Sequence, residues 1–179
     1  MNIKEIQVDI NRRLANGESK SAVFQFMRDQ GISDRKIARI IASYFDPQLG
    51  VQHARLIKAI IVIAWVQLAL ALLIALAAGI KMGLVGCLLL VAFIGAFAYL
   101  FVWGFTHSKA WAYNTTILLS MVNLPKALNG FTVTPIASSA TLLIGIALLA
   151  FTWHVRSKLF PDFLFMSPKK VKGAYVFSS

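Results

Sequence analysis

The sequence predicts an all-α integral membrane protein: a four-helix up-down bundle preceded by a small three-helix cytoplasmic module. Three observations lead to this fold class. Of the 179 residues, 58% are hydrophobic and 14% are charged, whereas soluble globular domains are about one quarter charged. No Asp or Glu occurs between Asp46 and Asp162, so this block lacks the polar face that a helix of a soluble protein shows. The same block contains four apolar runs, each close to the roughly 20 residues that cross a bilayer as a helix.

Residues 1–50 are expected to form the helical module. Apolar residues at helical spacing predict three short helices, marked by Ile3, Ile6, Ile10 and Leu14, then by Val23, Phe26 and Met27, then by Ile37, Ile40, Ile41 and Tyr44. Gly17 and Gly31 are the expected helix stops, and Ser33 is the expected N-cap of the third helix. Because three short helices share only a small core, the module is expected to lean on a partner or on the membrane.

Residues 51–156 hold the four apolar runs, which span residues 57–79, 82–105, 110–128 and 136–155. Each run is long enough for a transmembrane helix. The links between them are short, so consecutive helices are expected to be antiparallel neighbours, as in an up-down bundle. Residues 157–179 follow as a basic and aromatic cytoplasmic tail.

Lysine and arginine set the expected orientation, because cytoplasmic segments next to membrane helices carry an excess of these residues. With a cytoplasmic N-terminus, the basic residues before Ala59, in the middle link and after Val155 all fall on the cytoplasmic side. The opposite side keeps Lys81 and Lys126. The sequence therefore predicts a multi-pass protein of a bacterial-type inner (plasma) membrane, with both termini in the cytoplasm.

The tail carries three lysines among aromatic residues: Lys169, Lys170 and Lys172. Basic and aromatic residues just beyond the cytoplasmic end of a helix suit an anionic headgroup layer. We therefore expect these lysines to contact lipid headgroups. The alternative is a disordered, solvated tail.

The third apolar run carries a stripe of polar residues. Four of them recur on one helical face, Tyr113, Thr116, Ser120 and Asn123, and Gln67 of the first run is a candidate hydrogen-bonding partner for that face. Polar groups facing lipid tails are unfavourable, so this face is expected to meet other helices or a wet cavity. Interhelical hydrogen bonding is the favoured interpretation, and a ligand groove or a lined pathway is the alternative. The stripe contains no carboxylate, which argues against proton coupling and cation selectivity.

Small residues on the other runs are expected to form helix-packing seams, because they let helix backbones approach closely. They are Ala64, Ala71, Ala75 and Ala78 on the first run, Ala92 and Ala96 on the second, and Ser138, Thr141 and Gly145 on the fourth. Such seams would bind the bundle to itself or to a partner protein.

The stretch "RDQGISDRKIARII", residues 28–41, resembles the turn and second helix of a helix-turn-helix. The exposed side of that second helix would carry three basic residues, which are candidate docking contacts: Arg35, Lys36 and Arg39. Met27 stands where a small residue is expected, and Asp29 and Asp34 would face the phosphates of DNA. Because topology alone requires positive charge on this side, we expect a protein-docking module, not a nucleic-acid partner.

No motif of an enzyme is found. The sequence has no glycine-rich phosphate loop, no G-x-S-x-G and no H-E-x-x-H, so no catalytic residue, cofactor or metal is assigned and no enzymatic activity is expected. The single cysteine, Cys87, excludes an internal disulfide. His53, His107 and His154 share a predicted depth, but their spacing is not that of a metal site.

These observations favour a protein that works by binding in the membrane, as a subunit, an adaptor or an immunity-type inhibitor of another membrane component. The expected partners are the lipid bilayer and a membrane protein or a second copy of the chain. The sequence leaves two alternatives open. One is a membrane-anchored helix-turn-helix regulator that binds DNA, and the other is a small channel or carrier lined by the third apolar run.

Overall fold

The computed structural model of the protein describes residues 3–129, 135–164 and 167–178. Helices make up most of this part of the chain, which confirms the predicted all-helical class. They are α1 (Ile3–Ala15), α2 (Lys20–Asp29), α3 (Asp34–Ala42), α4 (Pro47–Gln52), α5 (Ala54–Gly79), α6 (Gly83–Thr106), α7 (Ala110–Asn129) and α8 (Pro135–Leu159), with a 3-10 turn, η1 (Ile80–Met82), between α5 and α6. A short antiparallel pair, β1 (Lys170–Val171) and β2 (Ala174–Tyr175), follows; the sequence patterns did not predict it.

The first three helices pack around a small apolar core. Its buried members come from the stripes that the sequence predicts: Ile6, Ile10, Val23, Met27, Ile37 and Ile41. Phe26 differs from the prediction because it points outward, where the guanidinium carbon of Arg13 lies 3.8 Å from the centre of its ring. A ring on the outer face of α2 gains this cation–π contact in place of burial.

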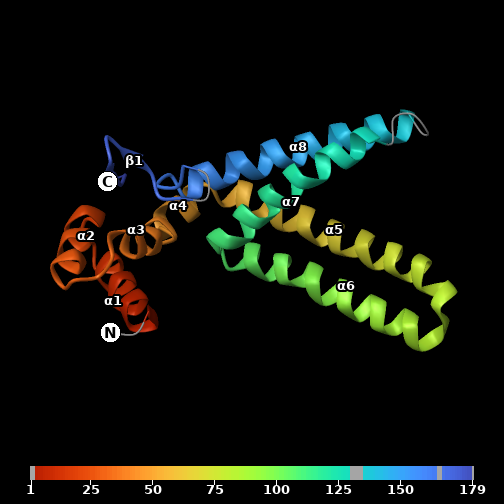
Figure 1. Ribbon diagram of the computed structural model, residues 1–179, viewed down its shortest axis with the longest axis horizontal. Helices are drawn as coiled ribbons and strands as arrows, with labels where there is room; N and C mark the ends of the chain where they lie inside the picture. Colours follow the sequence, from red (N-terminus) through yellow and green to blue (C-terminus); the bar gives the residue numbers. More distant parts are fainter. Residues whose placement is uncertain (1–2, 130–134, 165–166, 179) are drawn as a thin grey trace.

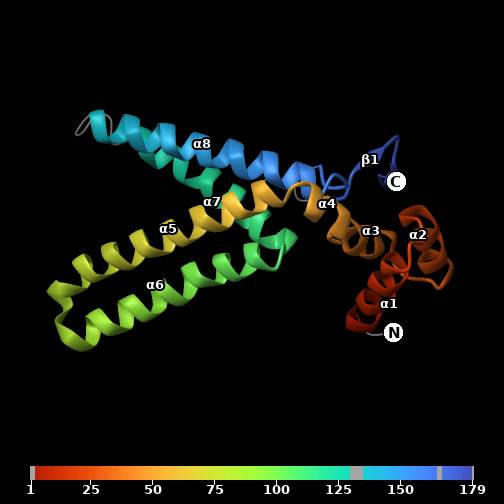
Figure 2. The same ribbon diagram turned by 180° about the vertical axis from the view of Figure 1, so that it is seen from behind.

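The four long helices form two antiparallel hairpins, α5–α6 and α7–α8, with extensive packing inside each hairpin. The two hairpins meet at the end that carries both chain termini and diverge toward the other end (Figures 1 and 2). At the shared end, a buried apolar cluster combines residues of all four helices: Ile60, Ala64, Val102, Phe105, Ala112, Tyr113, Val155 and Leu159. The four long helices therefore pack as two antiparallel pairs and not around one continuous core.

Because the two hairpins diverge, only some of the small residues predicted to pack between helices are buried within the chain. Ala64 and Ala75 are buried and Ala71 is half-buried, whereas Ala78, Ala92 and Ala96 are exposed. On α5 the close approach to the α6 backbone falls at Gly79, where a Cβ would lie 2.9 Å from the Cys87 Cα. On α6, Gly95 adds a side-chain contact, since a Cβ there would lie 3.0 Å from the Leu72 Cδ2. Ala92 and Ala96 are exposed and do not pack within the chain, so their role in packing against a partner protein stays a prediction.

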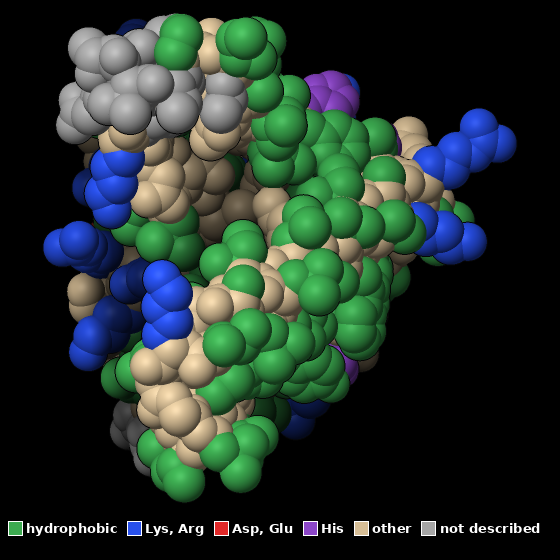
Figure 3. Space-filling model, turned by 90° about the vertical axis from the view of Figure 1, so that its right-hand side faces the viewer, with side chains coloured by type: hydrophobic (Ala, Val, Ile, Leu, Met, Phe, Trp, Pro, Cys, Tyr) green, Lys and Arg blue, Asp and Glu red, His purple; other side chains and the backbone are tan. Residues whose placement is uncertain are grey.

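Two segments are long and apolar enough to cross a membrane, judged by length and composition. One is Ala54–Thr106, which contains α5 and α6, and the other is Ser138–Leu159 within α8. The end view of the molecule displays mainly hydrophobic side chains, with a recess between the hairpins and Lys and Arg at the edges (Figure 3). The α7 helix, which carries the polar stripe, does not meet the same criterion. Four separate membrane spans therefore stay a prediction.

The C-terminal segment packs on the helical module. The Phe24 ring of α2 lies 5.7 Å from the Tyr175 ring and 5.4 Å from the Phe177 ring, centre to centre. Lys20 Nζ lies 2.7 Å from the Asp162 carboxylate, and that carboxylate also accepts a hydrogen bond from the Ser178 backbone N–H at 2.6 Å. The described part of the tail is thus joined to the module, in contrast to a solvated tail.

This packing alters the expectation for the tail lysines. Lys170 Nζ lies 4.4 Å from the centre of the Tyr175 ring, while Lys169 and Lys172 are exposed. The β1–β2 pair, in and next to which these lysines lie, is beside α2 and away from helices α5–α8 (Figure 1). Contact of Lys169, Lys170 and Lys172 with lipid headgroups stays a prediction, and their placement beside α2 does not support it.

Candidate binding groove between the two hairpins

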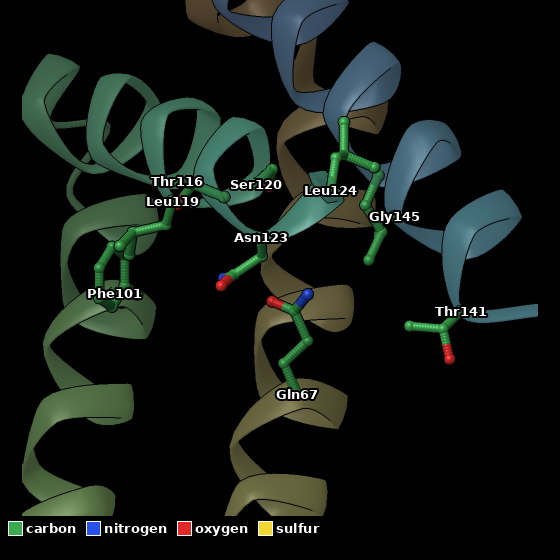
Figure 4. A pocket seen from close by; sticks show the side chains of 10 residues that line it. Gln67, Phe101, Thr116, Leu119, Ser120, Asn123, Leu124, Thr141 and Gly145 are labelled. Atoms are coloured by element: carbon green, nitrogen blue, oxygen red, sulfur yellow. The ribbon is translucent and has the colours of Figure 1, made fainter. Parts of the chain in front are cut away.

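A groove of about 290 Å³ lies between the two hairpins and takes its walls from all four long helices (Figure 4). Its lining residues are Gln67 of α5, Phe101 of α6, Thr116, Leu119, Ser120, Asn123 and Leu124 of α7, and Thr141, Gly145 and Leu148 of α8. Its volume suits one or two side chains of another molecule. The groove therefore has the size to receive the contact face of a helix lying between the hairpins, not a whole helix.

The polar lining comes mainly from one face of α7. Thr116, Ser120 and Asn123 recur at helical spacing, so the turn of the helix brings all three to the same wall of the groove. Gln67 faces them from α5, and the amide groups of Gln67 and Asn123 point toward one another (Figure 4). The structure thus brings together four of the five residues that the sequence assigned to the polar face.

The two amides of the groove have unused hydrogen-bonding capacity. Each carries two N–H donors and a carbonyl acceptor. Within the described parts of the chain, neither the Gln67 nor the Asn123 side chain makes a hydrogen bond, and both side chains are exposed. The predicted hydrogen bond between Gln67 and the polar face of α7 is therefore not formed in this structure.

The predicted packing residues of α8 are divided between the groove and the helix interface. Thr141 and Gly145 line the groove, whereas Ser138 is buried. A Cβ at Gly145 would lie 3.4 Å from the Leu124 Cδ2, an ordinary van der Waals contact. Gly145 therefore leaves room in the groove but is not required for a close backbone approach.

Tyr113, the fifth residue of the predicted polar face, lies outside the groove. Its side chain is fully buried at the joint of the hairpins, with ring centres 4.9 Å from Phe105 and 5.8 Å from Phe160. The hydroxyl has no hydrogen-bond partner in the part of the chain that the structure describes. The assignment of Tyr113 to the binding face is therefore wrong, because its ring packs with aromatic neighbours one turn before the groove begins.

We expect Tyr113→Phe to preserve the fold and to raise the free energy of unfolding by about 1 kcal/mol, since it removes a buried hydroxyl without a partner. Equilibrium unfolding in mixed detergent micelles measures the change. A loss of more than about 1 kcal/mol would contradict the environment described for this hydroxyl.

Arg156 is a second polar residue at the joint, and the sequence patterns did not predict its role there. It is 2% exposed, and its Nε donates a hydrogen bond to Asn114 Oδ1 at 2.7 Å. Its guanidinium carbon lies 5.4 Å from the Trp153 ring centre and 5.5 Å from that of Phe163. Arg156 thereby links α8 to α7 and to the C-terminal segment. The available signal was an arginine at the end of an apolar run together with Asn114, a polar residue off the stripe.

The predicted docking residues of α3 are exposed: Arg35, Lys36 and Arg39. Arg35 lines a cleft of about 700 Å³ with Arg28 of α2 and Lys170 of β1. The β1–β2 pair thus lies beside the start of α3, which is the part that a helix-turn-helix would insert into DNA. No group of three or more metal-ligating side chains occurs among residues 3–129, 135–164 and 167–178.

Comparison of the chain with protein-family models, with curated proteins and with solved structures finds no match.

Proposed function

We propose that the protein is a multi-pass membrane protein, with α5–α8 as four membrane-crossing helices. It works by binding a transmembrane helix of another membrane protein, whose contact face enters the groove between the two hairpins. One observation carries this proposal: the amides of Gln67 and Asn123 face an open groove without hydrogen bonds inside the chain. Both termini lie at one end of the helices, as the predicted cytoplasmic placement requires.

The depth of these amides supports a partner within the bilayer. Gln67 is near the middle of α5, so it would lie close to the centre of the membrane. Amides without partners are costly there, because lipid tails offer no hydrogen bonds. A helix that presents a polar side chain to Gln67 and Asn123 satisfies these groups, with about 1 kcal/mol or less for each interhelical hydrogen bond.

The walls of the groove support a helix as the occupant. Gly145 and Thr141 are small residues of α8 that line the groove, and small residues let a second helix approach closely. Large apolar residues that do not line the groove, such as Leu73 and Leu143, are exposed on the hairpins and suit lipid tails. The channel alternative gains no comparable support, because the described residues that line the groove include no acidic group.

Site-specific photocrosslinking in native membranes tests the proposal with two neighbouring positions of α7. Leu119 lines the groove, whereas Leu118 is exposed on α7 outside it. A photoreactive residue at 119 is expected to give a discrete adduct, and one at 118 is not. The crosslinked peptide should map to an apolar helical segment of another protein that contains at least one polar residue.

Two groove substitutions make the test specific. Gln67→Leu combined with Asn123→Leu should lower the yield of the 119 adduct about tenfold, since two interhelical hydrogen bonds are lost. Thr115→Val is the matched control, because Thr115 is a polar residue of α7 outside the groove, and it should leave the yield unchanged. Equal adducts from 118 and 119, an adduct only with a second copy of the chain, or insensitivity to the double substitution would each contradict the proposal.

A further inference from the structure

Two adjoining cavities lie where the helical module meets the link between α6 and α7. The larger, of about 600 Å³, takes Gln7 and Asn11 from α1, Tyr44 from the segment after α3, and Lys109 and Trp111 from the link and the start of α7. The smaller, of about 210 Å³, shares Gln7 and Trp111 with it and adds Arg39 of α3. Together they form one polar recess, which we call the junction recess.

The junction recess lies at the water–bilayer boundary if α5 and α6 cross the membrane. The apolar segment ends at Thr106, and α7 begins at Ala110, so His107, Ser108 and Lys109 directly follow the end of an apolar helix. Trp103 and Trp111 flank this link and are partly exposed. Tryptophan and a basic residue at such a position are typical of the headgroup layer.

The recess has the chemistry of a phosphate-binding site. Lys109 and Arg39 provide positive charge, and neither takes part in an ion pair within the described parts of the chain. Gln7, Asn11 and Tyr44 add neutral donors from the module side. The residues that line the two cavities include no Asp or Glu among those that the structure describes.

The apolar part of the lining points to the source of the phosphate. Trp111 and Ala110 line both cavities at the start of α7, where the polar recess meets the apolar helices. A free phosphate ion would use only the polar wall. A phospholipid would use both walls, with its headgroup in the recess and its acyl chains along α6 and α7.

We propose that the junction recess binds the headgroup of an anionic phospholipid, with the phosphate held by Lys109 and Arg39. This inference rests on the membrane placement in the proposed function but not on binding of a helix in the groove. It also moves the lipid contact from the tail lysines, where the sequence predicted it, to the link between α6 and α7.

Native mass spectrometry of the full chain, exchanged into micelles with equal phosphatidylglycerol and phosphatidylcholine, tests the proposal. The protein should retain phosphatidylglycerol in preference. Lys109→Gln and Arg39→Gln should each lower its retention about fivefold, as expected for the loss of one cation near the membrane surface. The matched control is Lys126→Gln, at the far end of the helices, which should leave retention unchanged.

Several results would overturn the inference. They are equal retention of the two lipids, equal effects of Lys109→Gln and Lys126→Gln, and displacement of the lipid by millimolar inorganic phosphate, which would identify a soluble anion as the ligand. Unchanged helical circular dichroism of each variant excludes loss of fold as the cause. Gln67→Leu with Asn123→Leu should leave lipid retention intact, so failure of the groove proposal and failure of this one are distinguishable.

Discussion

Replacement of Asp162 by alanine is expected to release the C-terminal segment from the helical module and to lower the stability of that contact by about 3 kcal/mol. The Asp162 side chain is 5% exposed and lies 2.7 Å from Lys20 Nζ, which belongs to a side chain that is 16% exposed. Its other oxygen accepts the Ser178 backbone N–H at 2.6 Å. Alanine at this position leaves the Ser178 N–H without its acceptor and leaves the largely buried Lys20 ammonium without its anion, with the Ser178 hydroxyl at 3.2 Å as the acceptor that remains. This costs more than the loss of a surface ion pair.

Hydrogen–deuterium exchange of the full chain in detergent measures this release. In Asp162→Ala, amides of residues 167–178 should exchange faster by about two orders of magnitude, corresponding to about 3 kcal/mol of local stability. The control is Asp34→Ala, because Asp34 is an exposed carboxylate of the same module, and it should change stability by less than about 0.5 kcal/mol. Unchanged exchange of the tail in Asp162→Ala would contradict the anchoring role of this carboxylate.

The contact between Asp162 and Lys20 illustrates what local sequence patterns do not reveal. The two residues are far apart in the sequence, and no periodicity relates them. The available signal was chemical: Asp162 is the one acidic residue after Asp46. An acidic residue in a basic segment invites a search for its cation, but several lysines and arginines of the module qualify equally from sequence alone.

Helix positions were predictable because they follow from properties of single segments. Apolar residues at helical spacing identified α1–α3, and runs of bilayer length identified the regions of α5–α8. How the hairpins pack was not predictable, because helices that are apolar on all sides give no preference for one face over another. Ala92 and Ala96 are exposed, whereas Gly79 lies against the backbone of α6, so small residues alone do not determine the packing face.

The candidate groove was predictable to the extent that polarity at bilayer depth is rare. Gln67, Thr116, Ser120 and Asn123 stood out for that reason, and the structure brings them to one groove. Tyr113 has the same helical spacing, but spacing does not tell whether a tyrosine is placed by its apolar ring or by its polar hydroxyl. In this protein the ring determines the position, since Tyr113 is buried among aromatic side chains.

Gly104→Val is expected to disrupt the joint between the hairpins and to lower the free energy of unfolding by about 3 kcal/mol, the upper end of typical overpacking effects. A Cβ at Gly104 would lie 2.6 Å from the Ala112 Cβ and 3.0 Å from Trp111 Cζ2. The carbonyl of Gly104 also accepts the Lys109 backbone N–H at 2.8 Å, which fixes the tight link to α7. Because the neighbouring Ala112 atom is bound directly to the backbone, relief of the clash requires α6 and α7 to move apart.

Equilibrium unfolding in mixed micelles measures the loss of stability, and the adduct from position 119 reports on the groove. Because α7 carries most of the polar wall, its displacement by Gly104→Val should also remove this adduct. Gly145→Ala is the matched control: its Cβ meets Leu124 Cδ2 at 3.4 Å, and alanine favours the helix by about 1 kcal/mol relative to glycine. Gly145→Ala should therefore keep or slightly raise stability. Equal stability of the two variants would mean that the close contact at Gly104 does not hold the two hairpins together. That result would contradict the role given to this contact in positioning α7 at the groove.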